Sequence, residues 1–203
     1  DALISLAGPA NKQGRIIADN ICGGDSRYLG SQGSSVIKVF DMTAATTGIN
    51  ETNAKKSGLE VDTVILSPMS HAGYYPGGKV MTMKVVFEKE SYRLLGAQII
   101  GYEGVDKRID VLATAIHAGL KATQLKDLDL AYAPPYSSAK DPVNMAGFMI
   151  DNIAKGTLKQ WHLEDMDKIS RDKSVVLLDV RTVGEFNRGH MNGFKNIPVD
   201  DLR

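Results

Sequence analysis

Apolar residues recur at the spacing of an amphipathic α-helix in several segments of the chain. Over residues 105–120 they return every three or four positions, so one face of a helix would be apolar. A second helix is predicted to begin at Asp141-Pro142, because proline suits the first helical position, and to end near Gly156. The other predicted helices are residues 9–22, 50–57 and 123–128.

Alternating or β-branched runs predict β-strands between these helices. The polar segment 88–93 separates two such runs and predicts a hairpin. Two loops rich in turn-forming residues, 71–78 and 131–140, interrupt the pattern. Together these elements predict an α+β domain over the first 155 residues. The predicted strands are residues 35–41 with an extended continuation to 47, and then 60–66, 79–88 and 94–102.

The pattern changes after residue 155. Residues 155–161 are typical of a linker, and the apolar run 175–180 predicts a strand. A short helix over 182–187 and a strand over 195–199 follow. Strand, helix and strand in succession favour a small α/β domain.

The balanced charge of the chain argues against nucleic acid and anionic membranes as primary partners. The 203 residues are 43% hydrophobic and carry 24 basic and 24 acidic side chains, so no net field favours nucleic acid or an anionic membrane. No apolar run approaches the length of a membrane span. The lone Cys22 cannot form an internal disulfide, which fits a reducing cytoplasm, and its helical setting predicts a small buried apolar residue. The chain begins without Met, and we expect it to be a piece of a longer polypeptide.

No complete catalytic set follows from spacing alone. The sequence has no glycine-rich dinucleotide fingerprint, no Walker loop and no nucleophile elbow. The four histidines lie far apart and there is no C-x-x-C pair, so we predict no metal site. Periodicity and spacing therefore predict a fold class and no reaction.

Three segments resemble one enzyme family. They are Leu6 to Arg15, followed by Ala18-Asp19-Asn20; the loop His71 to Gly77; and Leu130 to Ser137 with Lys140-Asp141-Pro142. As a set they resemble the coenzyme A-disulfide reductases and NADH oxidase-like members of the pyridine nucleotide-disulfide oxidoreductases. The resemblance implies that residues 1–30 are the end of an FAD domain with a connecting helix. It also implies that 31–155 form a mixed-sheet interface (dimerisation) domain of a homodimer.

The resemblance also implies site residues. Tyr132 and Tyr74 would support catalysis at the partner subunit, the nucleophilic cysteine lying outside this chain. The cofactor FAD would be contacted by Leu6, Ala7, Gly8 and Tyr132, and coenzyme A by Lys12, Tyr74 and Lys140. NAD(P)H would be the co-substrate. A phenol can hydrogen-bond a thiolate or donate a proton to a leaving one.

The residues alone leave a simpler interpretation open. The tyrosine loops could be rigid packing elements with wet hydroxyl groups, and the lysines could be solvated surface residues. Tyr75 and Tyr136 are expected to be packing residues.

Residues 160–203 resemble the N-terminal part of a rhodanese-like domain, here incomplete. The matching residues are Leu178 to Arg181, Glu185-Phe186, Gly189 to Gly193 and Asn196-Ile197-Pro198. Asp179, Arg181 and His190 are then expected to be structural. The sulfur-carrying cysteine of that family has no counterpart here, so we predict no sulfurtransferase activity for this piece.

The implied function is that of an FAD-dependent NAD(P)H:disulfide oxidoreductase reducing coenzyme A disulfide, persulfide or polysulfide. Two alternatives stay open: an NADH oxidase with oxygen as acceptor, or a purely structural dimerisation module. We expect this chain alone to be inactive.

Overall fold

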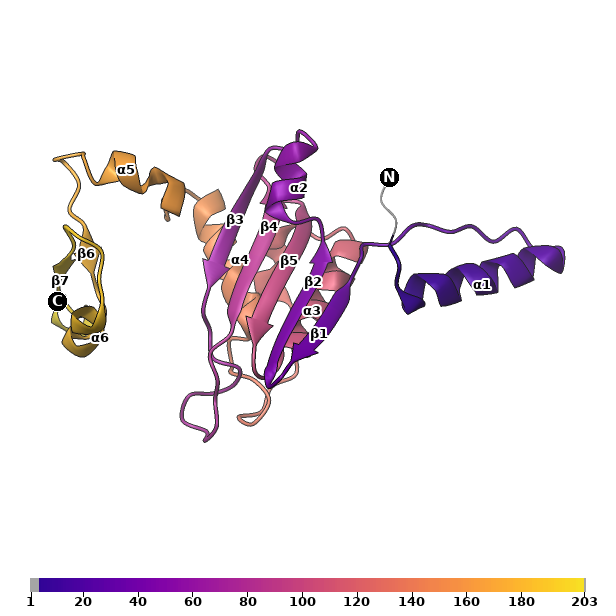
Figure 1. Ribbon diagram of the computed structural model, residues 1–203, viewed down its shortest axis with the longest axis horizontal. Coiled ribbons are helices and arrows are strands. Elements are labelled where there is room, and N and C mark those ends of the chain that lie inside the picture. The colour runs from indigo at the N-terminus through magenta and orange to yellow at the C-terminus, as the bar shows by residue number, and fades with distance from the viewer. Residues whose placement is uncertain (1–3, 203) are drawn as a thin grey trace. The chain divides into compact units, whose positions relative to one another are not determined.

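The chain folds as two compact units that divide between Leu158 and Lys159. The computed structural model describes residues 4–202, and each unit is considered by itself (Figure 1). Within the described residues, no helix is both long and apolar enough to cross a membrane.

The first unit contains a five-stranded sheet in the order β1-β2-β5-β4-β3, and every neighbouring pair is antiparallel. The prediction of a mixed sheet was therefore wrong. The pairs β1–β2, β3–β4 and β4–β5 are each joined by a loop that turns the chain back on itself, which makes the neighbours antiparallel. The strands are β1 (Ser35–Val39), β2 (Met42–Gly48), β3 (Val61–Leu66), β4 (Thr82–Glu88) and β5 (Leu94–Gly101).

The first hairpin differs from the sequence prediction of one extended segment over residues 35–47. The chain reverses between β1 and β2 at Phe40 and Asp41. Phe40 has a φ of 52° and is 93% exposed, a left-handed conformation that residues with a β-carbon adopt rarely. Neither residue is the glycine or asparagine that normally marks such a turn, so the pattern gave no signal for it.

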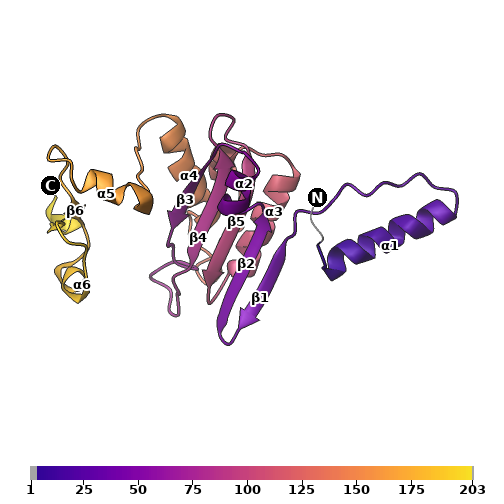
Figure 2. The same ribbon diagram turned by 45° about the horizontal axis from the view of Figure 1, so that its top comes forward.

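Two helices cover one face of the sheet (Figure 2). Helix α3 (Val105–His117) packs on β2 and β5, and α4 (Pro142–Ala154) packs on β3 and on the 3₁₀ helix η1 (Ala122–Asp127). Both helices were predicted, and their apolar stripes form the core with the strands. The fully buried core side chains include Val64, Met83, Val85, Leu112, Leu125, Val143 and Ile150.

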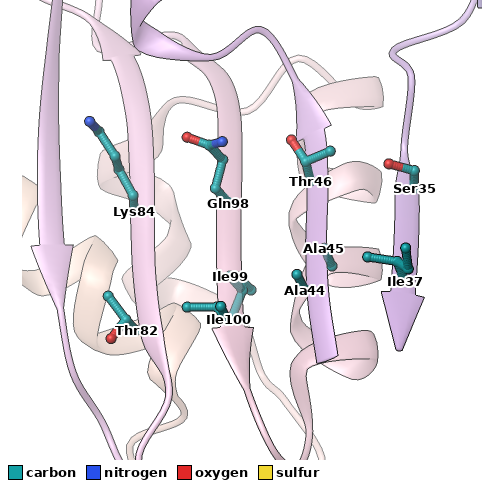
Figure 3. A pocket seen from close by; sticks show the side chains of 10 residues that line it. All are labelled: Ser35, Ile37, Ala44, Ala45, Thr46, Thr82, Lys84, Gln98, Ile99 and Ile100. Carbon is teal, nitrogen blue, oxygen red and sulfur yellow. The ribbon is translucent and has the colours of Figure 1, made fainter. Parts of the chain in front are cut away.

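The opposite face of the sheet is open along part of its length. Lys84, Gln98, Thr46 and Ser35 stand side by side on it, one on each of four adjacent strands (Figure 3). These residues and their neighbours line a shallow hollow of about 410 Å³. Helix α2 (Glu51–Lys56), begun by the Asn50 side chain as predicted, contacts β3, and the Glu51 carboxylate pairs with Lys84.

Helix α1 (Ala7–Ile21) matches the predicted helix 9–22, but all fifteen of its residues are exposed or half-buried. Cys22, which follows it, is exposed, so the prediction of a buried apolar cysteine was wrong. The physical reason is that the apolar face of the helix is uncovered in the described chain: Ile17 is 59% and Ile21 81% exposed.

The second unit has the predicted order of strand, helix and strand. Strands β6 (Leu178–Asp179) and β7 (Lys195–Asn196) pair in parallel, with α6 (Val183–Arg188) between them in sequence. Both strands are shorter than the apolar runs suggested. The helices α5 (Met166–Ile169), η2 (Leu163–Asp165) and η3 (Val199–Asp201) were not predicted, because segments this short have no periodicity to detect.

Candidate functional site

The first tyrosine loop lies between β3 and β4. Its two arms are held together by the Ser70 amide, which donates to the Lys79 carbonyl at 2.7 Å. At the tip, the buried His71 ring packs edge-on against Tyr75, with ring centres 5.6 Å apart. A β-carbon at Gly78 would lie 2.8 Å from the Met69 methyl group and 3.2 Å from the buried His71 ring, so this arm lies close to both side chains. Contacts within the loop thus define its shape.

The second tyrosine loop connects η1 to α4. The amides of Tyr136 and Ser137 both donate to the Ala133 carbonyl, at 2.9 and 3.1 Å, and close a tight turn. The Lys107 ammonium donates to the Ala131 carbonyl at 3.2 Å and attaches the start of the loop to α3. These hydrogen bonds to the backbone on both sides of Tyr132 therefore fix the segment that carries it.

The two loops meet at one end of the sheet, although 58 residues separate their tyrosines (Figure 1). The Ala72 amide donates to the Ser137 carbonyl at 2.9 Å. The hydroxyl oxygens of Tyr74 and Tyr132 lie 2.8 Å apart and share a hydrogen bond. Both rings reach solvent, Tyr74 being 77% and Tyr132 45% exposed. We call these two side chains the tyrosine pair.

Tyr132 keeps its proton at neutral pH. The hydrogen bond with Tyr74 raises the pKa of Tyr132 above its ordinary value of 10, and burial of the hydroxyl adds to that effect. A protonated phenol is a hydrogen-bond donor. The pair therefore presents a proton to any acceptor that approaches from solvent.

A buried ion pair lies behind the loops. The Arg108 guanidinium donates to the Asp141 carboxylate, with a shortest distance of 2.9 Å. Asp141 also accepts from the Val143 amide at 3.0 Å and so begins α4, as Asp141-Pro142 predicted. Burial raises the pKa of Asp141, but hydrogen bonds from Ser137 and the Val143 amide, together with Arg108, outweigh it, so the pKa lies below its ordinary value.

The start of α1 was predicted to contact FAD. Leu6 precedes the helix with an apolar side chain, and the first intrahelical bond is from Ala10 to the Leu6 carbonyl. The amides of Ala7 and Gly8 lie ahead of that bond, at the positive end of the helix dipole. Leu6 and Ala7 border a hollow of about 610 Å³. The first turn of α1 carries no charged residue, and Gly8 has no side chain to block the approach of a ligand. The start of the helix therefore fits the polar, electron-rich edge of a flavin ring.

The other predicted residues are not joined to the tyrosine pair. Lys12 is an exposed residue of α1. Lys140 is exposed on the second loop, and its ammonium lies 5.8 Å from the centre of the Phe148 ring. Tyr75 packs on His71 as expected, whereas Tyr136 is 72% exposed, so its prediction as a packing residue was wrong. The Tyr136 amide is bonded to the Ala133 carbonyl in a tight turn, and the side chain at this turn is not covered by the core.

In the second unit the three residues expected to be structural make local bonds. Arg181 forms a bidentate pair with Asp179 and donates to the Gly189 carbonyl at 2.9 Å. The His190 ring stacks on Phe186 with centres 3.6 Å apart. These contacts connect β6 to the end of α6.

Comparison with known proteins identifies the first unit. Residues 34–142 match the dimerisation domain of the pyridine nucleotide-disulphide oxidoreductases. The coenzyme A disulfide reductase of Staphylococcus epidermidis is 38% identical over 148 residues, covering 72% of this chain and 33% of that protein.

Two solved structures match the whole chain. Reduced CoADR-RHD from Bacillus anthracis is 48% identical with a TM-score of 0.93, and an NAD-dependent persulfide reductase from A. fulgidus is 42% identical with a TM-score of 0.87. Each match covers 100% of this chain and 36% of the other. The chain therefore spans about a third of its relatives. It belongs to the FAD-dependent pyridine nucleotide-disulphide oxidoreductases, and residues 34–142 are their dimerisation domain.

Proposed function

We propose that this chain is the dimerisation region of an NAD(P)H:disulfide oxidoreductase that reduces coenzyme A disulfide, a persulfide or a polysulfide. In this proposal two subunits pair, and each contributes its tyrosine pair to the flavin and substrate site of the other. The names of the similar proteins from Staphylococcus epidermidis and A. fulgidus support this range of substrates.

The observation that carries the proposal is the tyrosine pair itself. Two loops remote in sequence are bonded to each other, and their hydroxyl groups lie 2.8 Å apart at an exposed edge of the domain. Tyrosines serving only as packing would have their rings covered, whereas Tyr74 is 77% exposed. Two exposed phenols held in a fixed arrangement favour a role in ligand binding over a role in packing.

The chemistry follows from the phenol groups. When an enzyme thiolate attacks a disulfide, one sulfur leaves as a thiolate and requires a proton or a hydrogen bond. Tyr132 would donate to that sulfur, and Tyr74 would orient the Tyr132 hydroxyl and replace the proton from solvent. Bound FAD would carry electrons from NAD(P)H to the disulfide.

The remaining binding residues are assigned on the family resemblance. The amides of Ala7 and Gly8 would hold the polar edge of the flavin, since they lie at the uncapped start of α1. Lys12 and Lys140, both exposed, would contact the phosphates of coenzyme A as point charges.

Two substitutions in the full-length reductase test the role of the pair. Tyr132→Phe removes the donor, and kcat with coenzyme A disulfide should fall by about 10²-fold, in the range of general acid catalysis. Tyr136→Phe is the matched control, because it removes an exposed hydroxyl from the same loop. Equal activities of both variants and wild type, with normal flavin content, would mean that this region is only a structural dimerisation module.

The acceptor is decided by comparing substrates. NADH consumption by the full-length enzyme should be faster with coenzyme A disulfide or polysulfide than with oxygen. Faster turnover with oxygen, unaffected by Tyr132→Phe, would instead support the NADH oxidase alternative.

We also propose the domain limits. Residues 1–30 would be the end of the FAD domain with its connecting helix, 31–155 the dimerisation domain, and 160–203 the N-terminal part of a rhodanese-like domain. The parallel pairing of β6 with β7 around α6 supports the last assignment. A crystal structure of the full-length protein in which β6 lacks further parallel neighbours would contradict it.

A further inference from the structure

Arg108 is the most deeply buried charged side chain near the tyrosine loops, with 1% of its surface exposed. It lies in the first turn of α3, where its guanidinium donates to five different residues. Besides Asp141, the acceptors are the Ser70 carbonyl at 3.0 Å, the Ser137 hydroxyl at 3.1 Å, the Gly104 carbonyl at 3.2 Å and the Tyr136 carbonyl at 3.4 Å.

These acceptors belong to both tyrosine loops. Ser70 directly precedes the loop that carries Tyr74, and Ser137 closes the turn of the loop that carries Tyr132. We propose that Arg108 is a positioning residue for the tyrosine pair, setting the spacing of the two loops from beneath. This inference rests on the proposed function, in which the pair acts on the substrate.

Only arginine matches this set of acceptors. Its planar group has five donors in fixed directions, whereas a lysine ammonium has three donors at a single point. The backbone makes room for it at Gly104, where φ is 68° and a β-carbon would lie 2.0 Å from Arg108 Nη1. Asp141 balances the buried charge of the guanidinium.

The role is indirect, because Arg108 is covered by the loops. It contacts the Tyr136 carbonyl and the Ser137 hydroxyl, which lie four and five residues after Tyr132. A loop displacement of about 1 Å would break a hydrogen bond that is now 2.8 Å long. Misplacement of this size can lower a catalytic rate by about 10²-fold.

The first arm of the test measures the tyrosine pair without activity. In this chain, labelled with ¹³C at the tyrosine Cζ, Tyr132 should titrate above its ordinary pKa, and Tyr74→Phe should lower that pKa. Arg108→Lys and Ser137→Ala should lower it in the same direction. Ser137→Ala keeps the Arg108–Asp141 pair and serves if Arg108→Lys does not fold.

Lys126→Met is the matched control. It breaks the 2.7 Å pair of Lys126 with Asp151, which lies ten residues, or about 15 Å, along α4 from Asp141. The Tyr132 titration should not move in this variant. A wild-type titration in both Arg108→Lys and Ser137→Ala would overturn the positioning role.

The second arm is a double-mutant cycle in the full-length reductase. Arg108→Lys should lower kcat by about 10- to 100-fold with little change in KM for NAD(P)H. Adding Tyr132→Phe should then cause little further loss, because the pair is already misaligned. Fully additive losses would overturn the inference. A Tyr132→Phe enzyme with normal kcat would overturn the proposed function instead, and the titration would still report on the loops.

Discussion

Each unit of the chain contains an arginine that forms a fork with an aspartate. Arg108 donates to both oxygens of Asp141, and Arg181 donates to both oxygens of Asp179. Each arginine also donates to a backbone carbonyl, Ser70 for Arg108 and Gly189 for Arg181. Both pairs consist of the same two residue types, so any difference in their effect on stability must come from their surroundings.

The surroundings differ in burial and in sequence distance. Arg108 is 1% exposed and its partner lies 33 residues away, so the pair joins α3 to the start of α4. Arg181 is 46% exposed and its partner is two residues away. A buried charge that loses its partner remains uncompensated, whereas an exposed one is solvated by water. The first pair should therefore stabilise the fold and the second should mainly order a turn.

Arg108→Met should have the largest effect. It removes the hydrogen-bonded guanidinium from the buried Asp141 carboxylate, leaving only the Lys107 ammonium at 4.0 Å, and it removes the bonds to both tyrosine loops. We expect a loss of about 3–5 kcal/mol in the free energy of unfolding. Urea titration followed by far-UV circular dichroism would measure it, because most helix and strand residues belong to the first unit.

The two units can be followed separately in that titration. Trp161, the single tryptophan, lies in the second unit, so its fluorescence should be unchanged by Arg108→Met. A first unit that unfolds at the same urea concentration as wild type would show that the buried pair contributes no stability, and the comparison would fail.

Glu51 provides an intermediate case. Its side chain is 24% exposed and pairs with Lys55 and Lys84, and hydrogen bonds from these two lysines lower its pKa from 4.5 to about 2. A lowered pKa stabilises the fold above pH 4.5, and this stability is lost as the pH falls towards 2. The difference corresponds to roughly 3 kcal/mol, which solvent screening reduces to about 1–2 kcal/mol.

The measurement is the stability of the first unit between pH 6 and 2. Glu51→Gln should remove part of the acid-induced loss and flatten the curve. Glu60→Gln is the matched control, because the Glu60 carboxylate is 85% exposed. Identical curves for the two variants would show that the Glu51 cluster does not contribute to acid sensitivity.

Ser137→Ala separates the hydrogen-bond network from the charge. The buried hydroxyl donates to Asp141 at 2.7 Å and accepts from Arg108 at 3.1 Å, and the ion pair survives its removal. We expect a loss of about 1 kcal/mol in the free energy of unfolding, the usual contribution of such a bond. A loss as large as that of Arg108→Met would mean that the network, and not charge burial, distinguishes the two arginine sites.

Much of the fold could be predicted from the sequence. Helices α3 and α4 and strands β3 to β5 were predicted because their apolar residues follow a single period over many positions. The reversal at Phe40 was missed, since its left-handed conformation is imposed by strand pairing and not by a turn residue. Helix α1 was predicted from its own sequence. Whether its apolar face is covered depends on residues outside the helix, so the burial of that face could not be predicted from the same pattern.

The site could be predicted only in part. The resemblance selected Tyr74 and Tyr132 one at a time, and their hydrogen bond depends on how two distant loops meet. Arg108 gave no signal, because a charged residue in an amphipathic helix is normally exposed. Its partner Asp141 was noted only as the start of a helix, which is one of its two roles.

Arg181→Met should have the smallest effect. The guanidinium is solvated on one side, and the Asp179 carboxylate still accepts from the Arg181 backbone amide at 3.0 Å after the side chain is removed. The turn after β6 also keeps the bonds from Asn196 to the Asp179 and Arg181 carbonyls, at 3.0 and 2.8 Å. We expect the urea midpoint, followed by Trp161 fluorescence, to stay at the wild-type value. A marked fall would mean that this exposed fork stabilises its unit as the buried one does, and burial would not be the distinguishing factor.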